Sequence, residues 1–388
     1  MRRSDPFAYR LIPTLWRRPR HSRSTLLEHR GMETTNRWSR LKTNHQPPDP
    51  GDQVPQLSEE DRRRQAELEK DLQLARDIQQ GMLLAAVPYL HGWEFSAVSL
   101  PARDLGGDLY DFLPLRNGHQ AIMIGDVSGK GLQAALRMAV ARTLFRYEAR
   151  HGESPAMTLA SVNRGVCSDI PHGMVTMLYA ILNPGDGTVR IANAGHTYPL
   201  LFKGKVQEFE LPGLPLGVDP DIDYDEEETI MMAPGESLFL YTDGVNEATD
   251  PDEREFGFER LQKLLEASSQ VKPRTLMKLI LNELRTWSDG NAQSDDITMV
   301  VLRRRFAGLG DELRVVAADV LGHERAGAFW GEVEVMLPCA PNCATPDDWM
   351  ALLAEISALA KKLLSRGLAR ELSQEVRMTI EEYRYSDA

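Results

Sequence analysis

Four short segments place aspartates beside apolar, strand-like runs. They are GGDLYDF with Asp108, IGDVSGKG with Asp126, LYTDGVNE with Asp243, and SDDIT with Asp295 and Asp296. Each segment lies beside glycine or in a turn, so the backbone is able to bring the carboxylates close together. Carboxylates gathered in one site repel one another, and without cations their pKa values rise. The pattern therefore predicts a site that collects positive ions.

The residue types in these segments indicate which ions. Oxygen-only ligands from aspartate and backbone carbonyls suit hard cations such as Mg²⁺ or Mn²⁺. The chain has three cysteines, and the pair Cys339 and Cys343 lacks the second pair or nearby histidine of a zinc site. Two hard cations about 3.5–4 Å apart hold a bridging water, lower its pKa and clamp a phosphoryl oxygen. Two-metal phosphoryl chemistry is the expectation.

The segments that must position these aspartates lie between Trp93 and Arg305. Apolar or alternating runs in this range predict strands, and short turns such as NPGDGT between them are typical of antiparallel hairpins. Helical periodicity occurs in Leu132–Ala149, Ala156–Val166 and Pro273–Trp287. These helices fall between groups of strands, so we expect an α+β layered sandwich of antiparallel sheets with helices outside.

A helix is predicted at residues 57–84, immediately before the first strand. Its apolar residues follow at spacings of three and four and share one narrow stripe, formed by Leu68, Leu72, Ala75, Ile78 and Met82. A narrow stripe is typical of a coiled-coil seam. Two interpretations remain open for this helical linker, taken as residues 57–86. It packs on its own catalytic domain, or it forms a homodimer with a second copy.

The two ends of the chain differ in character. Residues 1–56 mix Arg, Ser, His and Pro without periodicity, which predicts a disordered tail, and Met32 is an alternative start of translation. Residues 87–305 form the expected catalytic domain. Residues 306–388 contain two amphipathic stretches, at 349–364 and 369–383, and are expected to be a mostly helical segment without a motif that assigns its role.

Composition narrows the functional class. The 388 residues carry a net charge of −12, although residues 1–50 hold 11 Lys and Arg against 4 Asp and Glu. A nucleic-acid-binding protein concentrates positive charge on its folded part, whereas here the folded part is acidic. The sequence contains no run of 18 apolar residues, so no membrane span is predicted. The first 30 residues lack the apolar core of a signal peptide. A cytoplasmic protein with reduced thiols is expected.

Taken together and in order, these motifs resemble the stage II sporulation protein E-type branch of the metal-dependent, type 2C protein phosphatases. The resemblance covers about residues 66–304. It is carried by LEKDLQLARDIQQGML, GGDLYDF, GDVSGKG, NAGHTYP, LPLG, LFLYTDGVNEA and SDDITMVVL. It implies a four-layer αββα sandwich, two Mn²⁺ or Mg²⁺ ions, and hydrolysis of phosphoserine or phosphothreonine by a metal-bridging hydroxide. It also implies a phosphorylated partner, a STAS-type anti-anti-sigma regulator.

The resemblance assigns the metal ligands residue by residue. They are the carboxylates of Asp108, Asp126, Asp243 and Asp295 and the backbone carbonyl of Val127. Asp296 is placed beside the last of them, in a supporting position.

Two further residues carry open assignments. His196, in NAGH, either protonates the leaving oxygen or is a histidine hydrogen-bonded at a strand end. Lys130, in SGKG, either draws the phosphate towards the metals or is a solvated loop residue. Two other classes of function also remain as alternatives: a non-enzymatic metal-binding regulatory module, and a nucleotide cyclase or other two-metal phosphohydrolase.

Overall fold

The structure is a computed structural model that describes residues 58–83, 87–151, 154–170, 173–224, 227–337, 339–341 and 343–386. The tail predicted for residues 1–56 lies outside the described residues. The first described element is the helix α1 (Glu59–Leu83), which begins with three acidic residues that complement the helix dipole. None of the described helices is long and apolar enough to cross a membrane.

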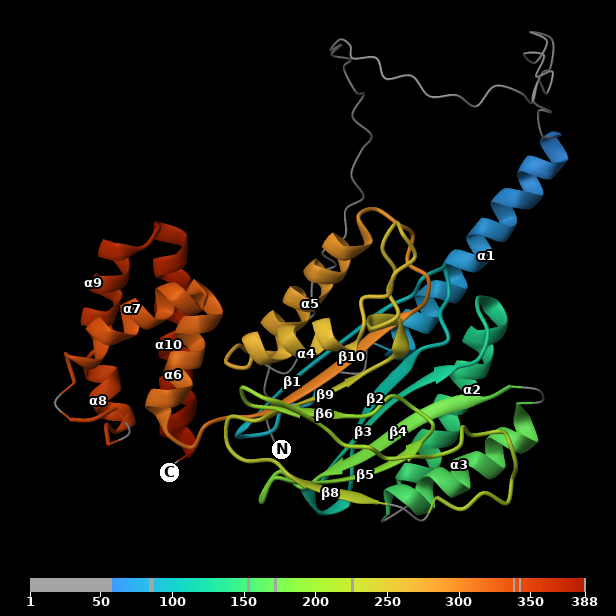
Figure 1. Cartoon of the computed structure of the whole chain (residues 1–388), viewed down its shortest axis with the longest axis horizontal. Helices are drawn as coiled ribbons and strands as arrows, with labels where there is room; N and C mark the ends of the chain where they lie inside the picture. The colour runs from blue at the N-terminus through green and yellow to red at the C-terminus, as the bar shows by residue number, and fades with distance from the viewer. Residues whose placement is uncertain are drawn as a thin grey trace, which may run out of the picture. The chain divides into compact units, whose positions relative to one another are not determined.

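Two five-stranded antiparallel sheets form the centre of the fold (Figure 1). The first sheet has the order β1 (Trp93–Leu100), β10 (Ile297–Arg304), β9 (Ser237–Tyr241), β6 (Leu200–Phe202) and β7 (Val206–Glu208). The second has the order β2 (Leu109–Pro114), β3 (Gln120–Val127), β4 (Val175–Leu182), β5 (Thr188–Ala194) and β8 (Glu228–Met231). Short turns join β2 to β3 and β4 to β5 as antiparallel hairpins, whereas the chain between β3 and β4 contains two helices.

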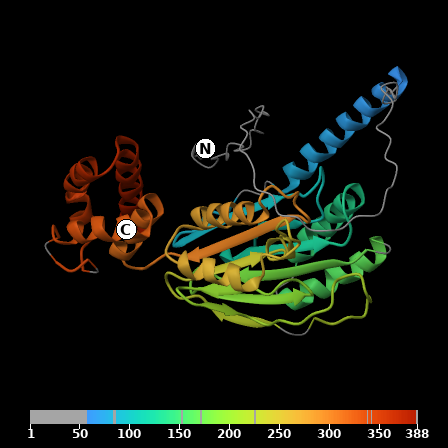
Figure 2. The same ribbon diagram turned by 45° about the horizontal axis from the view of Figure 1, so that its top comes forward.

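Helices cover the outer face of each sheet (Figures 1 and 2). The second sheet is covered by α2 (Leu132–Ala149) and α3 (Pro155–Asp169), and the first by α4 (Phe258–Ala267) and α5 (Pro273–Ser288). The predicted α+β sandwich of two antiparallel sheets with helices outside is therefore confirmed. The helix α3 begins at Ser154, whose side chain accepts a hydrogen bond from the Met157 amide, with proline in the first turn.

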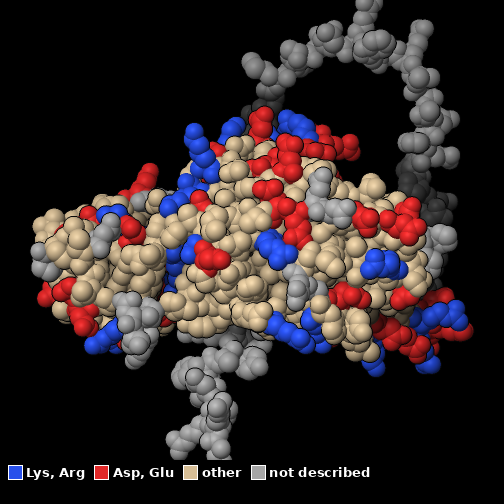
Figure 3. All heavy atoms as spheres, turned by 90° about the horizontal axis from the view of Figure 1, so that it is seen from below, with Lys and Arg blue, Asp and Glu red and all other residues tan. Residues whose placement is uncertain are grey.

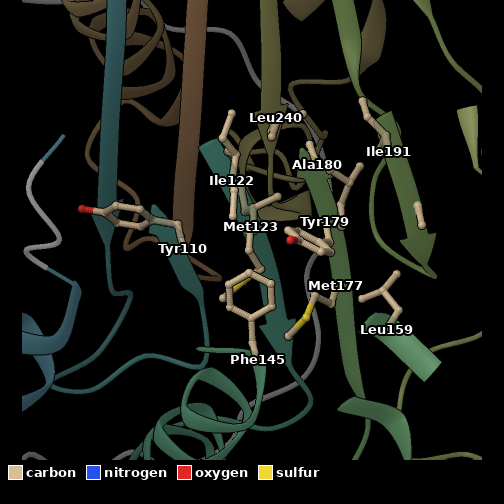
Figure 4. Packing of buried hydrophobic residues seen from close by; sticks show 14 of the residues in the cluster. Tyr110, Ile122, Met123, Phe145, Leu159, Met177, Tyr179, Ala180, Ile191 and Leu240 are labelled. Carbon is tan, nitrogen blue, oxygen red and sulfur yellow. The ribbon is translucent and has the colours of Figure 1, made fainter. Parts of the chain in front are cut away.

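The central strands are buried on both faces, which is why they read as continuous apolar runs. On β10, Val300 and Leu302 belong to the core that the two sheets share, while Met299 and Val301 belong to the core under α4 and α5. Figure 4 shows Phe145 of α2 reaching the second sheet, where its ring meets Tyr179 edge-on at 5.0 Å. The core between the two sheets and the cores between sheets and helices are therefore packed on the same central strands.

The C-terminal segment folds into a separate helical core. Its helices are α6 (Leu309–Leu321), α7 (His323–Glu334), α8 (Pro346–Ala351), α9 (Leu353–Leu363) and α10 (Arg366–Ser386). The sequence predicted the region of α8 to α10 but missed α6 and α7. Most residues of α6 are buried, so it lacks the one-sided polar pattern by which amphipathic helices are recognised. Two glycines, Gly327 and Gly331, weaken the helical signal in α7.

A buried ionic seam joins this helical core to the sandwich. The Arg303 guanidinium, at the end of β10, forms two 2.8 Å hydrogen bonds with Glu312 of α6 and one of 2.7 Å with Glu94 of β1. Lys272, before α5, pairs with Glu375 of α10 at 2.8 Å. Charges buried this deeply are tolerated because each one has an opposite partner.

We expect the Arg303–Glu312 pair to be essential to this seam. Glu312→Gln removes a negative charge that balances the buried Arg303 guanidinium. The substitution should therefore lower the free energy of unfolding by about 3 kcal/mol. Denaturant titration measures this loss. Asp311→Asn is the matched control, because its pair with Arg314 is partly exposed and should cost less than about 1 kcal/mol. Equal losses in the two variants would contradict the assignment.

Candidate metal centre

Strand pairing brings the predicted aspartates to one end of the sandwich. Asp108 immediately precedes β2, and Asp126 lies near the end of β3, which pairs with β2 through Leu109 and Gly125. In the other sheet, Asp243 follows β9, while Asp295 and Asp296 precede β10, the antiparallel neighbour of β9. Antiparallel pairing thus places two aspartate-bearing loops of each sheet side by side.

Hydrogen bonds join the aspartate loops of the two sheets. The Thr242 hydroxyl of the first sheet donates to Asp108 Oδ2 of the second at 2.8 Å. The Asp296 carboxylate accepts from the backbone N–H of Gly107 at 2.6 Å and of Ala102 at 2.7 Å. Because both of its oxygens are engaged by backbone donors, Asp296 orders the loop that carries Asp108.

The glycines of GGD are required by close packing in this loop. A Cβ on Gly107 would lie 2.7 Å from the Val127 carbonyl oxygen, and one on Gly106 would lie 2.5 Å from Asp296 Oδ2. Glycine at both positions therefore allows the loop to approach the Val127 carbonyl, the one backbone ligand that the resemblance assigns.

The carboxylates raise one another's pKa. Burial, followed by the nearby Asp126, raises the pKa of Asp108 well above its usual value. Burial and the charges of Asp243, Asp295 and Asp296 raise the pKa of Asp126 to about 6. Burial and Asp295 also raise the pKa of Asp243. Oxygen donors whose charges are mutually destabilising are the donor set that hard divalent cations neutralise, so these residues fit such ions.

The cluster is open rather than closed around one point. Across the described ranges, no three His, Cys, Asp or Glu side chains converge closely enough to form a complete ligand group. Asp295 instead pairs with Lys130, whose Nζ lies 2.9 Å from its Oδ2 and 2.8 Å from the Ser294 carbonyl oxygen. Lys130 is thus at the rim of the cluster and acts there as a positive counter-charge.

His196 lies beside the cluster but in a buried position. Its Nδ1 is 2.9 Å from the Thr176 hydroxyl, and the Asp126 amide donates to that same hydroxyl at 3.3 Å. Burial lowers the pKa of His196 to about 3, so the imidazole is neutral at neutral pH. Asn193 further fixes the His196 backbone through two hydrogen bonds. These contacts favour the strand-end interpretation, in which His196 supports the segment that carries Asp126.

One residue of α1 also holds the Asp108 loop. The side chain of Gln79 is buried, and its amide both donates to the Gly106 carbonyl at 2.7 Å and accepts from the Gly106 N–H at 3.2 Å. Arg76 adds a 3.0 Å hydrogen bond to the Asp104 carbonyl. No pattern in the sequence indicated these contacts, because glutamine and arginine on a polar helix face are ordinarily expected to be exposed to solvent.

The sequence reading also missed two groups next to Asp243. Thr242 bonds Asp108, and its position directly before the TDG turn could have drawn attention to it. Glu247, one helical turn after Asp243, lies close enough that Asp243 helps raise its pKa, second to burial.

Comparison with known proteins shows which family this chain resembles. The profile of the family described as Stage II sporulation protein E (SpoIIE) matches residues 116–305. The chain is 32% identical over 248 residues to the phosphoserine phosphatase RsbU of Bacillus subtilis (strain 168), spanning 62% of this chain and 72% of RsbU. It is 31% identical over 264 residues to protein IcfG of Synechocystis sp. (strain ATCC 27184 / PCC 6803 / Kazusa), spanning 60% of this chain but 41% of IcfG.

A solved structure supports the fold alone. The SiaA-PP2C domain of Pseudomonas aeruginosa superimposes with a TM-score of 0.55 at 22% sequence identity. The match covers 62% of this chain and 98% of that domain. The layered sandwich is therefore an established architecture.

Removing one central carboxylate should reveal the repulsion directly. The raised pKa of Asp126 means that the folded, metal-free protein loses stability as the pH rises from about 4 to about 6. Asp126→Asn abolishes that loss. Above pH 6 in a chelator, the variant should be more stable than the parent by about 1–2 kcal/mol, a range reduced for partial solvent screening.

Denaturant titration with and without Mn²⁺ provides the measurement. The parent should gain stability from Mn²⁺, and Asp126→Asn should gain much less. The exposed Asp221→Asn is the control and should behave as the parent does. An equal Mn²⁺ effect in all three proteins would refute the assignment of Asp126.

Proposed function

This chain belongs to the stage II sporulation protein E (SpoIIE) family of type 2C phosphatases, and we propose that it hydrolyses phosphoserine or phosphothreonine in a protein. The observation that carries the proposal is the cluster of Asp108, Asp126, Asp243 and Asp295, whose mutual repulsion fits divalent cations. The match to RsbU spans 72% of the length of that protein, which is named a phosphoserine phosphatase. This similarity supports the same reaction class.

The proposed cofactors are two Mn²⁺ or Mg²⁺ ions. The carboxylates of Asp108, Asp126, Asp243 and Asp295 and the Val127 carbonyl would hold them, while Asp296 keeps its backbone partners. When bound, such ions lower the pKa of a water nucleophile and neutralise phosphoryl oxygens. This assignment needs no serine or cysteine nucleophile from the protein.

The remaining residues of the cluster would position and balance charge. Lys130 neutralises Asp295 in the metal-free protein, and its release from that pair would leave an ammonium group at the rim for a phosphoryl oxygen. His196, through Thr176, would hold the Asp126 segment in place. The proposed leaving-group proton therefore comes from solvent rather than from His196, because the buried imidazole is neutral.

The proposed substrate is a phosphorylated regulatory protein of the STAS type, dephosphorylated in the cytoplasm. This choice rests on the family resemblance and on the exposed position of the cluster's rim, where Lys130 and Asp295 are both partly accessible to a folded partner. A purely regulatory, non-enzymatic metal-binding role is the alternative, and turnover distinguishes the two.

A phosphatase assay tests this proposal. Purified protein with Mn²⁺ should release phosphate from phosphoserine proteins faster than from phosphotyrosine peptides. Asp243→Ala should reduce turnover by more than about a hundredfold because it deletes a proposed ligand, whereas Asp289→Ala, outside the cluster, should not. Absence of turnover would favour the non-enzymatic module, and preference for phosphotyrosine would rule out the substrate class.

We propose further that α1 mediates association with a second copy. One face of this helix is bound to its own domain through Gln79 and Leu83. Leu74 and Ile78 lie on other positions of the helix and are 59% and 54% exposed. Exposed leucine and isoleucine on a helix that is otherwise strongly polar fit a helix–helix contact. In this proposal, the face with Gln79 and Leu83 docks on the catalytic domain, and the face with Leu74 and Ile78 contacts the second copy.

Replacing these apolar residues tests the homodimer. Leu74→Asp with Ile78→Asp should convert a dimer to a monomer while leaving the Gln79 clamp, because both side chains are exposed. Light scattering coupled to gel filtration measures the mass. Gln73→Asp with Gln80→Asp is the control at exposed positions of the same helix. An unchanged mass in the leucine–isoleucine variant would exclude this face as the interface.

A further inference from the structure

The C-terminal helical core carries a groove of mixed chemistry. Two adjoining hollows, of about 570 Å³ and about 560 Å³, lie between the α8–α9 region and α10. They share Ser357 of α9 and Ser373 of α10, so they form one continuous α9–α10 groove. All residues of its lining are described.

The groove has an apolar end and a basic end. The apolar end is lined by Met350, Ala351, Leu353 and Ala354. The basic end is lined by Lys361, Arg366 and Arg370. A fourth cation, Arg377, lies on α10, the helix that also carries Arg366 and Arg370. On α10, these arginines recur at spacings of four and seven residues with Ser373 between them, so they share one face of the helix.

These cations have no partners in the part of the chain that the structure describes. Among the described residues, the side chains of Lys361, Arg366, Arg370 and Arg377 take part in no hydrogen bond or ion pair, and all four are exposed. The acidic side of α10 is already engaged, because Glu375 pairs with Lys272 and Glu382 with Arg305. The seam with the sandwich therefore uses these two acids of α10, while Arg366, Arg370 and Arg377 of the same helix are exposed.

This accumulation of positive charge departs from the rest of the segment. Residues 356–370 hold four basic residues and no acidic one, although acidic residues outnumber basic ones in 306–388. Figure 3 shows basic and acidic side chains interspersed over the face that it presents. Three further acids, Glu355, Glu371 and Glu381, lie on α9 and α10 and are exposed, but none lines the groove.

We propose that the α9–α10 groove is a docking site for an acidic, amphipathic segment of a partner protein. Carboxylates of that segment would pair with Arg366, Arg370 and Lys361, and its apolar residues would fill the end lined by Met350 and Leu353. An apolar end favours a peptide over a nucleic acid, which offers phosphates but no aliphatic side chains. The inference is independent of the phosphatase proposal, because no residue of the aspartate cluster takes part.

A binding experiment with the full chain tests the groove. The probe is a fluorescein-labelled helical peptide with glutamate on one face and leucine on the other, followed by fluorescence anisotropy. Binding should be saturable and should weaken with salt, because exposed charges are screened. Arg370→Glu should weaken it by about tenfold or more, since attraction becomes repulsion. Arg325→Glu, on α7 and also exposed, is the matched control and should bind as the parent does.

Two further probes separate the chemistry from general polyanion binding. A peptide in which serine replaces the leucines should bind more weakly, and a DNA duplex should not compete. Because Arg370 is exposed, the thermal unfolding transition of Arg370→Glu should match that of the parent. A loss of peptide binding in this variant would then result from the change in the groove and not from unfolding. The proposal is overturned by absent binding, by equal loss in Arg325→Glu, or by equal affinity for the serine peptide or DNA.

Discussion

Repulsion among buried carboxylates is the constraint on which the active end of this protein depends. Four aspartates from two sheets gather at this end, and burial together with the charges of neighbouring carboxylates raises the pKa values of Asp108, Asp126 and Asp243. A chain left to itself would relax such a cluster by separating the loops. The two sheets prevent this, because each pair of loops is fixed by antiparallel registers that are buried on both faces.

Local contacts then hold the individual aspartates in place. Backbone amides donate hydrogen bonds to Asp296, the Thr242 hydroxyl donates to Asp108, and Lys130 balances the charge of Asp295. Gln79 of α1 clamps the same loop from outside through Gly106. The position of Asp108 therefore depends on three separate elements, α1, β9 and the segment before β10, and any of them is able to alter the geometry available to a cation.

The strand β10 connects this end to the C-terminal helices. Asp295 and Asp296 precede it, and Arg303 near its other end is buried between Glu94 and Glu312. A buried guanidinium cannot leave its partners without a large cost, so the helical core is a firmly attached part of the protein. Glu312, Glu375 and Glu382 serve this attachment, whereas the basic residues Lys361, Arg366, Arg370 and Arg377 line the α9–α10 groove. Charge on α10 is thus divided between an internal and an external use.

The sequence by itself determined the sandwich and the identity of the clustered aspartates. Apolar runs with turn signals specify antiparallel strands locally, and the ordered motifs around Asp108, Asp126, Asp243 and Asp295 fix which loops carry charge. Only the tertiary structure shows the contacts of Gln79, Thr242, Asp296 and His196. These contacts join residues distant in the chain, such as Gln79 with Gly106 and Thr242 with Asp108. The helix α6 escaped prediction for a related reason, since burial on most sides removes the polar periodicity that a sequence displays, whereas Gly327 and Gly331 weaken the helical signal in α7.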